Sequence, residues 1–372
     1  MANIDFEQKL DFLLKGLRFK ALFSYKNYNK TTTSRSQGIN RYTLTGYTQN
    51  ADGSYSLNIS PFGSSNPSKP VLSTTSSVAG DRRIYFQSYV DYMNKFGNHN
   101  VSGMLLWNID QYDNNAPGNL VASLPRRKMG FAGRLSYDYD NRYMFEVNAG
   151  YNGSENFAKG HKWGFFPSVA VGWNVSQENF FEPLKDVISN LKLRASYGLV
   201  GNDQLLDSSG GLIRFIYMSD ITLQSENAGF TTGDKQQITL NGPVYTRYQN
   251  NDLTWEVGEK LNVGFDMQLF NSLNVTVDAF REIRRDIFQQ RYSIPNYLGT
   301  ASTAVYGNLA KVKNYGFDLS LDYGKQINKD LAIQFKGTFT FARNEILEYD
   351  EAPGVRPSLS NIGKKLNTIY GM

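Results

Sequence analysis

The feature that most constrains this fold is a strict two-residue alternation of apolar and polar side chains. The stretch RYMFEVNAGYNGS, from Arg142 to Ser154, carries an apolar or aromatic side chain at every second position. Successive side chains of a strand point to opposite faces, so the stretch predicts a strand with one apolar and one polar face. In a soluble sandwich the apolar face packs on a second sheet. In an outer-membrane barrel it faces lipid and the polar face lines the lumen.

The alternation recurs along the whole chain, and no segment of helical period longer than about ten residues competes with it. The strands predicted from it span residues 2–8, 17–28, 82–96, 99–111, 129–140, 142–153, 165–176, 190–199, 256–270, 273–285, 311–325 and 331–344. The chain is therefore expected to be nearly all β.

The connections between the predicted strands alternate between short and long. Tight turns such as FGNHN, DN and QINKD are followed by long stretches, the longest at about 28–81 and 200–254. A barrel with short periplasmic turns and long extracellular loops shows this asymmetry, whereas strict alternation over so many connections is not expected in a sandwich. We therefore predict an antiparallel transmembrane β-barrel whose apolar face touches outer-membrane lipid.

Composition agrees with this prediction. No run of about 18 apolar residues exists, which excludes a membrane-spanning helix. Hydrophobic residues make up only 40% of the chain, as a barrel allows, because only alternate strand residues meet lipid. Tyr137, Tyr139 and Tyr143 flank a tight turn, where an aromatic girdle would sit; ordinary strand-end aromatics in a soluble sheet are the alternative.

The sequence offers little for catalysis, so we expect no enzyme, no cofactor and no metal site. Cysteine is absent, and the two histidines, His99 and His161, lie far apart in a turn and a loop. The acidic spacing of YDYDNRY resembles the start of a calcium loop but lacks the remaining ligands and the turn glycine. The net charge of +5 is scattered rather than collected in a stripe, which argues against nucleic acid as a partner.

Binding is expected in the long loops and on the polar face of the strands. Loop aromatics among amides and hydroxyls suit sugar rings, peptide backbone or a partner protein, although packing within the loop is the alternative. These substrate- or partner-binding candidates are Tyr217, Phe230, Tyr245, Tyr248 and Trp255. The residues expected to line the lumen are Arg134, Glu146, Lys192, Arg194 and Asp266.

Three arginine pairs lie near strand ends toward the long loops: Arg82–Arg83, Arg126–Arg127 and Arg284–Arg285. Such pairs suit lipopolysaccharide phosphates, and a solvated rim is the alternative.

Six motifs occur in the order and at about the spacing seen in the SusC/RagA family of TonB-linked outer-membrane transporters. They are KGLRFKALFSYKNY, RRKMGFAGRLSYDYDNRYMFEVNAGYNGSENF, WGFFPSVAVGWNVSQENFF, NLKLRASYGLVGND, NNDLTWEVGEKLNVGFDMQLFNSLNVTVDAFREIRRDI and VKNYGFDLSLDY. The chain resembles this family from about residue 2 to residue 372. The resemblance implies a plugged barrel of about 22 strands in the outer membrane of a Gram-negative bacterium. It also implies TonB-coupled import of oligosaccharides or peptides together with a SusD-like surface lipoprotein.

The sequence departs from the family pattern at both ends. No signal peptide, TonB box or plug domain precedes the first strand, and about 12 of about 22 strands are present. We therefore expect residues 1–372 to form a partial barrel domain of an importer, with TonB acting through the missing plug region. The alternatives are a β-rich surface binding or adhesion module and a non-functional truncated product; an upstream plug with a TonB box in the same reading frame discriminates between them. An open sheet leaves strand edges unsatisfied in lipid, so the fragment alone should aggregate.

Overall fold

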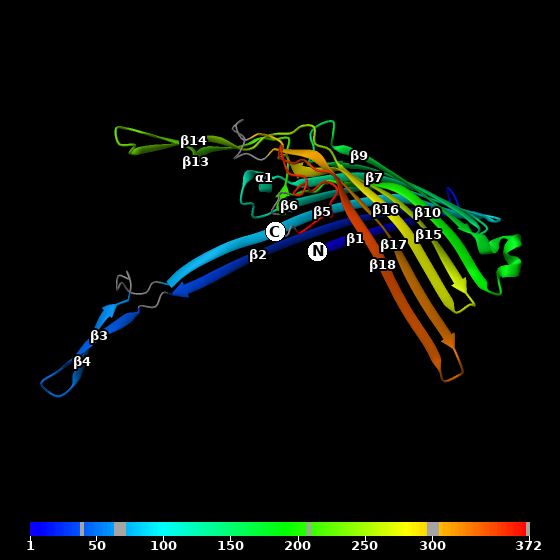
Figure 1. Ribbon diagram of the computed structural model, residues 1–372, viewed down its shortest axis with the longest axis horizontal. Helices are drawn as coiled ribbons and strands as arrows, with labels where there is room; N and C mark the ends of the chain where they lie inside the picture. The colour runs from blue at the N-terminus through cyan, green and yellow to red at the C-terminus, as the bar shows by residue number, and fades with distance from the viewer. Residues whose placement is uncertain (38–40, 63–71, 207–209, 296–304, 370–372) are drawn as a thin grey trace. The chain divides into compact units, whose positions relative to one another are not determined.

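Twelve strands form one sheet in the computed structural model, which describes residues 1–37, 41–62, 72–206, 210–295 and 305–369 (Figure 1). Along the sheet they are β1 (Ala2–Lys9), β2 (Leu17–Gln37), β5 (Leu72–Phe96), β6 (His99–Asn114), β7 (Arg126–Tyr139), β8 (Tyr143–Ser154), β9 (Trp163–Asn174), β10 (Ile188–Asn202), β15 (Glu256–Leu269), β16 (Leu273–Gln290), β17 (Tyr306–Gln326) and β18 (Ala332–Glu348). Among the described residues, β1 and β18 each have a strand neighbour on one side only.

Each predicted strand overlaps one observed strand, so the predicted all-β antiparallel fold is confirmed. Several strands run further toward the long loops than the alternation indicated. β2 continues to Gln37, β5 begins at Leu72, and β17 begins at Tyr306. Within the described residues, no helix is both long and apolar enough to span a bilayer.

The chain divides into two compact units. The smaller unit comprises Met1 and residues 26–83 and 112–125, and the larger unit comprises residues 2–25, 84–111 and 126–372. The smaller unit contains the hairpin of β3 (Tyr42–Gln49) and β4 (Tyr55–Pro61), and the short helix α1 (Leu120–Ser123).

The β3–β4 hairpin has one apolar and one polar face. A bulge lies between Leu44 and Gly46. The extra residue returns Tyr47 to the face that carries Leu44, because a one-residue shift changes the side to which a side chain points. The apolar face carries Tyr42, Leu44, Tyr47, Tyr55, Leu57 and Ile59.

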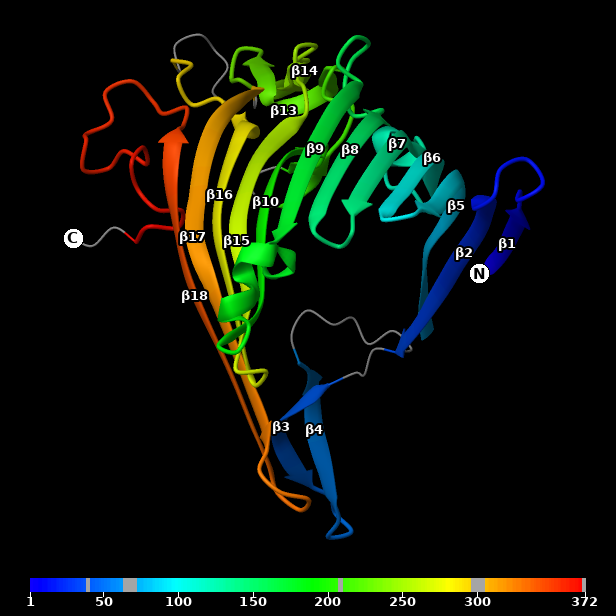
Figure 2. The same cartoon turned by 90° about the vertical axis from the view of Figure 1, so that its right-hand side faces the viewer.

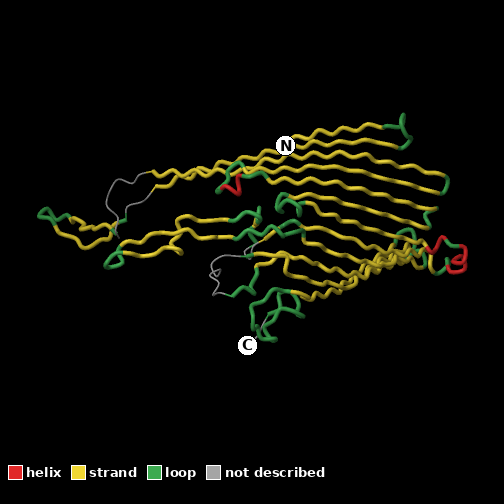
Figure 3. Tube along the Cα trace, turned by 90° about the horizontal axis from the view of Figure 1, so that it is seen from above, coloured by secondary structure: helices red, strands yellow, loops and turns green. Residues whose placement is uncertain are grey.

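In the larger unit, strands β7 to β10 and β15 to β18 form a curved wall and run side by side (Figures 2 and 3). In their register, even-numbered residues lie opposite even-numbered ones and odd-numbered residues opposite odd-numbered ones. Glu146 lies opposite Ser136 and Ala170, and Arg194 lies opposite Gly172 and Gly264. Even-numbered residues therefore share one face from β7 to β18 and odd-numbered residues share the other, apart from bulges near the long loops and between Ile188 and Asn190 at the start of β10.

The odd-numbered face is apolar and exposed. Leu135 is 53% exposed, Val171 49% and Val263 50%. In the described part of the chain no second layer covers these side chains, so this sheet does not bury its apolar face as a soluble sandwich does. Of the two structures that the stretch RYMFEVNAGYNGS allows, the outer-membrane barrel therefore fits this sheet and the soluble sandwich does not.

The two ends of the wall differ as predicted. One end has tight turns, such as Asp140 and Asn141, both with φ of 55°, which Asp and Asn tolerate in two-residue hairpins. At this end the 3₁₀ helices η1 (Val175–Gln177) and η2 (Asn179–Leu184) join β9 to β10. The other end, called here the loop end, carries the connections 155–162, 203–255 and 291–305.

The longest of these connections holds two further hairpins. They pair β11 (Leu205–Leu206) with β12 (Leu212–Ile213), and β13 (Asp220–Thr232) with β14 (Ile238–Arg247). The pattern had indicated only an unstructured loop here.

Candidate functional site

The residues expected to line the lumen all lie on the even-numbered face of the wall. In the strand register, Lys192 of β10 lies opposite Asp266 of β15, and Arg134 of β7 lies opposite Asn148 of β8. Strand pairing thus brings together polar side chains that are far apart in the sequence. Their role in a lumen stays a prediction.

Arg194 connects three strands through two carboxylates. Its Nε lies 2.8 Å from Asp266 Oδ2, and a terminal guanidinium nitrogen lies 3.1 Å from Asp278 Oδ2. Thr276 Oγ1 donates a hydrogen bond of 3.1 Å to the other oxygen of Asp266. Asp278 was not among the predicted residues, although its even position in LNVTVDAF was a signal that it faces the same side.

Glu146 is held between two donors on the same face. Its carboxylate accepts hydrogen bonds from Ser136 Oγ at 2.9 Å and from Asn148 Nδ2 at 2.8 Å. Together with Lys192 and Arg194 it lines a hollow of about 660 Å³. This volume falls in the range of small-ligand sites. The lining combines these charged side chains with apolar ones such as Met93 and Met144.

At the loop end, the connections fold over the even-numbered face and build a small apolar core. The core consists of Phe157, Leu205, Ile216, Leu253 and Trp255, packed against Phe166, Ile213, Phe288 and Tyr306. Phe166 is an even-numbered residue of the regularly paired part of β9, so this face receives the loops. The adjacent pair Phe165–Phe166 breaks the strand alternation and was the available sequence signal for this core.

The predicted loop aromatics occupy different environments. Trp255 is only 7% exposed; its ring packs on Phe157 and Phe166, and its Nε1 donates to Lys162 O at 3.2 Å. Trp255 therefore packs within the loops, which was the alternative to a role in binding.

The remaining loop aromatics are less enclosed. The rings of Tyr245 and Tyr248 stack with centroids 5.1 Å apart, and Phe230 is 60% exposed. Burial raises the pKa of Tyr217, which is half-buried and lies against Phe215. Of the five loop aromatics predicted to bind a substrate or partner, the structure therefore brings Tyr245 and Tyr248 into contact with each other.

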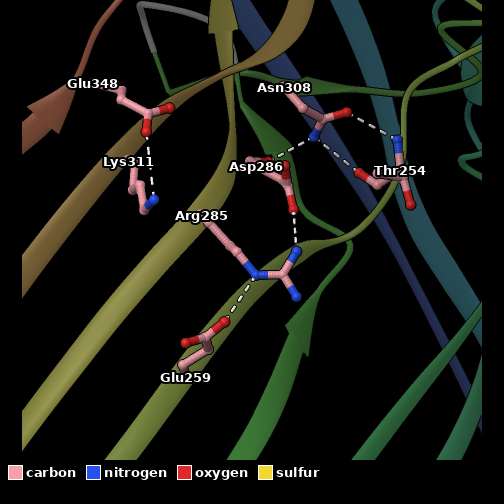
Figure 4. Close-up of polar contacts among 7 residues, drawn as sticks. All are labelled: Thr254, Glu259, Arg285, Asp286, Asn308, Lys311 and Glu348. Atoms are coloured by element: carbon pink, nitrogen blue, oxygen red, sulfur yellow. Dashed lines mark hydrogen bonds and ion pairs between the residues drawn. The ribbon is translucent and has the colours of Figure 1, made fainter.

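Side-chain contacts to backbone groups tie the loops to the strand ends (Figure 4). Asn308 Nδ2 donates to Thr254 O at 3.0 Å and to Asp286 O at 2.6 Å, and Thr254 N donates to Asn308 Oδ1 at 2.9 Å. Beside them, Arg285 pairs with Glu259 at 3.1 Å and with Asp286 at 2.8 Å. These contacts hold the end of the long connection against β16 and β17.

The odd-numbered face carries aromatic rings at both ends. The loop-end group is Phe131, Tyr151, Trp163 and Phe165, and the turn-end group is Tyr137, Tyr139, Tyr143 and Trp173. On β9, Trp163 and Trp173 are ten residues apart, which is about 33 Å along a strand. At a strand tilt of about 40° this gives a height of about 25 Å, the thickness of the apolar band on an outer-membrane barrel.

The histidines and the arginine pairs make ordinary polar contacts. His99 Nδ1 lies 2.8 Å from Tyr137 Oη, and Arg82 pairs with Asp113 at 3.1 Å. Across the described ranges, no group of three or more His, Asp or Glu side chains is arranged to hold a metal ion. Residues 38–40, 63–71 and 207–209 of the two longest predicted loops lie outside the described residues.

Comparison with known proteins gives matches over nearly the whole chain. The family described as "TonB dependent receptor-like, beta-barrel" matches residues 2–369. TonB-dependent receptor P3 of Formosa agariphila is 27% identical over 324 residues, which cover 77% of this chain and 30% of the relative. TonB-dependent receptor SusC of Bacteroides thetaiotaomicron is 29% identical over 220 residues, covering 59% of this chain and 20% of SusC.

Among solved structures, the RagAB peptide importer in its closed-closed state superposes with a TM-score of 0.68 at 19% identity. The match covers 97% of this chain and 38% of that chain. The chain thus spans well under half the length of the relatives that it matches. At this identity the superposition supports the fold alone.

Proposed function

The chain belongs to the TonB-dependent-receptor-like β-barrel family, and we propose that it forms part of the wall of a SusC-like outer-membrane importer. Proteins of this family reside in the outer membrane of Gram-negative bacteria, which confirms the location expected from the sequence. The family that matches and the curated relatives are TonB-dependent receptors, which confirms the expectation that the chain is not an enzyme.

The observation that carries the proposal is the division of the wall into two chemically different faces. The odd-numbered face exposes aliphatic side chains between two groups of aromatic rings, as lipid contact requires. The even-numbered face carries the Arg194, Glu146 and Lys192 side chains, which lipid would leave without solvation. We assign the first face to lipid and the second to the lumen.

The substrate of the proposed importer is an oligosaccharide or a peptide, taken up with a SusD-like surface lipoprotein and with energy supplied through TonB. One matched relative is a SusC receptor, and one of the matched solved structures is that of the RagAB peptide importer. The loop end fits such a role because the folded connections stand over the even-numbered face, where an incoming ligand would pass.

Metabolite depletion tests the importer proposal in the native host. Cultures of the wild type, a strain deleted for the gene of this protein and a strain without TonB receive a mixture of oligosaccharides and peptides. Import predicts that the two mutants fail to remove the same compound from the medium. If the deletion strain removes every compound as fast as the wild type while losing adhesion, a surface binding module becomes the better account.

A further inference from the structure

An apolar groove, called here the lipid-face groove, lies on the odd-numbered face of the wall. It has a volume of about 840 Å³ and crosses the neighbouring strands β8, β9, β10, β15 and β16 (Figure 2). Nine of the thirteen residues that line it are odd-numbered, and all nine are apolar or aromatic. The groove therefore lies on the opposite face of the sheet from the charged side chains of Glu146 and Lys192.

Strand register builds the groove from two rows of side chains that run across the strands. The first row runs from Tyr143 through Trp173, Leu193 and Phe265 to Val277. The second row consists of Val171, Ala195, Val263 and Ala279. Ala195 and Ala279 are the smallest of these side chains, so the sheet is depressed where they lie between the larger ones.

The lipid-face groove slopes across the apolar band of the wall. Its β8 end is Tyr143, two residues from the tight turn at Asn141, and its β16 end is Val277, six residues from the tight turn at Asn271. The difference of four residues is about 13 Å along a strand and, at a tilt of about 40°, about 10 Å in height. The groove thus begins among the turn-end aromatic rings and rises into the aliphatic part of the face.

The two rings at the low end of the groove are amphipathic. Tyr143 Oη and Trp173 Nε1 both donate to Glu178, at 2.6 Å and 3.1 Å, so their polar edges face the connection between β9 and β10. Rings of this kind lie at the headgroup level of a bilayer. A lipid whose headgroup lies beside Tyr143 and Trp173 would send its chain into the apolar band, which is the direction in which the groove rises.

We propose that the lipid-face groove binds one acyl chain of a phospholipid of the periplasmic leaflet and holds it more tightly than the surrounding lipid is held. Tight turns mark the periplasmic end of a barrel, which identifies the leaflet. The hydrocarbon of one leaflet is about 15 Å deep, so the groove follows most of a chain. A depression contacts the chain on several sides and gains dispersion attraction that a flat wall does not give. The proposal rests on the assignment of the odd-numbered face to lipid in the proposed function.

Fluorescence quenching in detergent tests the groove. The full-length protein is titrated with a phosphatidylethanolamine whose acyl chains carry bromine, because bromine quenches a tryptophan that it contacts. Trp173 lines the groove, whereas Trp163 lies on the same face at the loop end and is not part of the lining. Comparison with Trp173→Phe and Trp163→Phe isolates the emission of each ring. Half-quenching of Trp173 should need about tenfold less lipid than half-quenching of Trp163.

One substitution made at two positions separates the groove from the rest of the face. Val263→Phe places a ring inside the groove and should make Trp173 titrate like Trp163. Ala279→Phe, directly opposite on β16, should act in the same way. Val147→Phe adds the same ring to the odd-numbered face of β8 outside the lining and should leave the tenfold difference unchanged. Val263 and Val147 are both exposed, so neither ring disturbs a packed core.

The possible failures of this titration are distinguishable. Equal lipid requirements for the two tryptophans in the wild type would show ordinary contact with surrounding lipid and overturn the groove alone. Quenching of neither tryptophan would overturn the assignment of the face to lipid, and the groove with it. A wild type that is dimeric in detergent and becomes monomeric in Val263→Phe would assign the groove to a second copy of the chain and contradict the proposal. The titration needs no transport, so its result is independent of the depletion experiment.

Discussion

Lys128 Nζ lies 2.7 Å from Asp203 Oδ1, and this ion pair joins the loop end of β7 to the first residue after β10. The same Asp203 accepts from Ser154 Oγ, and its carbonyl accepts from Asn156 Nδ2 at 2.9 Å. The Asp203 side chain therefore fixes the start of the 203–255 connection to β7 and to the end of β8, and the Asp203 carbonyl fixes it to the β8–β9 connection.

Replacing Asp203 with Ala should loosen the start of that connection. Buried Asp203 loses two side-chain bonds, while Lys128 is half exposed and regains water, so we expect a cost of about 1–3 kcal/mol. Hydrogen exchange at residues 204–206 and 212–216 of the full-length protein should accelerate. The matched control is Glu182→Ala, which removes an exposed ion pair with Lys185 and should leave that exchange unchanged. Unchanged exchange in both variants would show that Asp203 does not hold the loop.

Two adjacent leucines give a sharper test of the loop core. Leu205 is 2% exposed and lies in the core, whereas its neighbour Leu206 is 48% exposed. Leu205→Ala should cost about 2–5 kcal/mol of local stability because it leaves a cavity. Leu206→Ala should cost under about 0.5 kcal/mol, as surface substitutions usually do. Limited proteolysis of the 203–255 connection reports the difference, and equal cleavage of the two variants would contradict the packing described.

The assignment of the two faces predicts opposite results for neighbouring positions on β15. Val263→Arg places a cation on the odd-numbered face and should cost about 2–4 kcal/mol at mid-membrane. Asn262→Arg places it on the even-numbered face beside Ser196, where water is expected. Heat-modifiable migration on gels reports the fraction of the protein that is folded in outer membranes. This fraction should fall for Val263→Arg and stay unchanged for Asn262→Arg. A fall of similar size for both variants would refute the assignment.

Glu178, in the connection between β9 and β10, predicts a pH dependence. Hydrogen bonds from Tyr143 Oη at 2.6 Å and Trp173 Nε1 at 3.1 Å lower the pKa of its carboxyl. A lowered pKa adds stability that is complete above the unfolded value of about 4.3 and is lost as the pH falls through the folded value.

The unfolding temperature of the full-length protein should therefore exceed that of Glu178→Gln at pH 7. The difference should shrink as the pH falls from 5 toward 3. Glu182→Gln, in the same connection but 71% exposed, provides the control. A difference that stays constant over this range would exclude the carboxylate as its cause.

Much of the wall follows from local sequence pattern. Alternation in YMFEVNAGY and LNVGFDMQL specifies both the strands and their faces, because side-chain direction in a strand depends only on residue parity. The face of Arg134, Glu146, Lys192, Arg194 and Asp266 was predictable for this reason. The ion pair from Arg194 to Asp278 was not, since it depends on the register between strands that are distant in the sequence.

The loop end was less predictable for a physical reason. Phe157 of the 155–162 connection meets Leu205 and Leu253, from opposite ends of the 203–255 connection, in one core. A contact of this kind leaves no periodic signal. The environment of Trp255 could not be predicted from the sequence either. Its neighbours in the sequence carry amides and hydroxyls, as in a binding loop, yet its ring is enclosed by Phe157 and Phe166.

The constant parity from β7 to β18 has a consequence for how such a protein can change over evolution. Inserting or deleting one residue inside a strand exchanges the lipid side and the lumen side for the remainder of that strand. Tight turns with two fixed residues, such as Asp140–Asn141, tolerate length changes little better. We therefore expect changes in chain length to be tolerated mainly at the loop end, where ligand preference can diversify while the wall keeps its length.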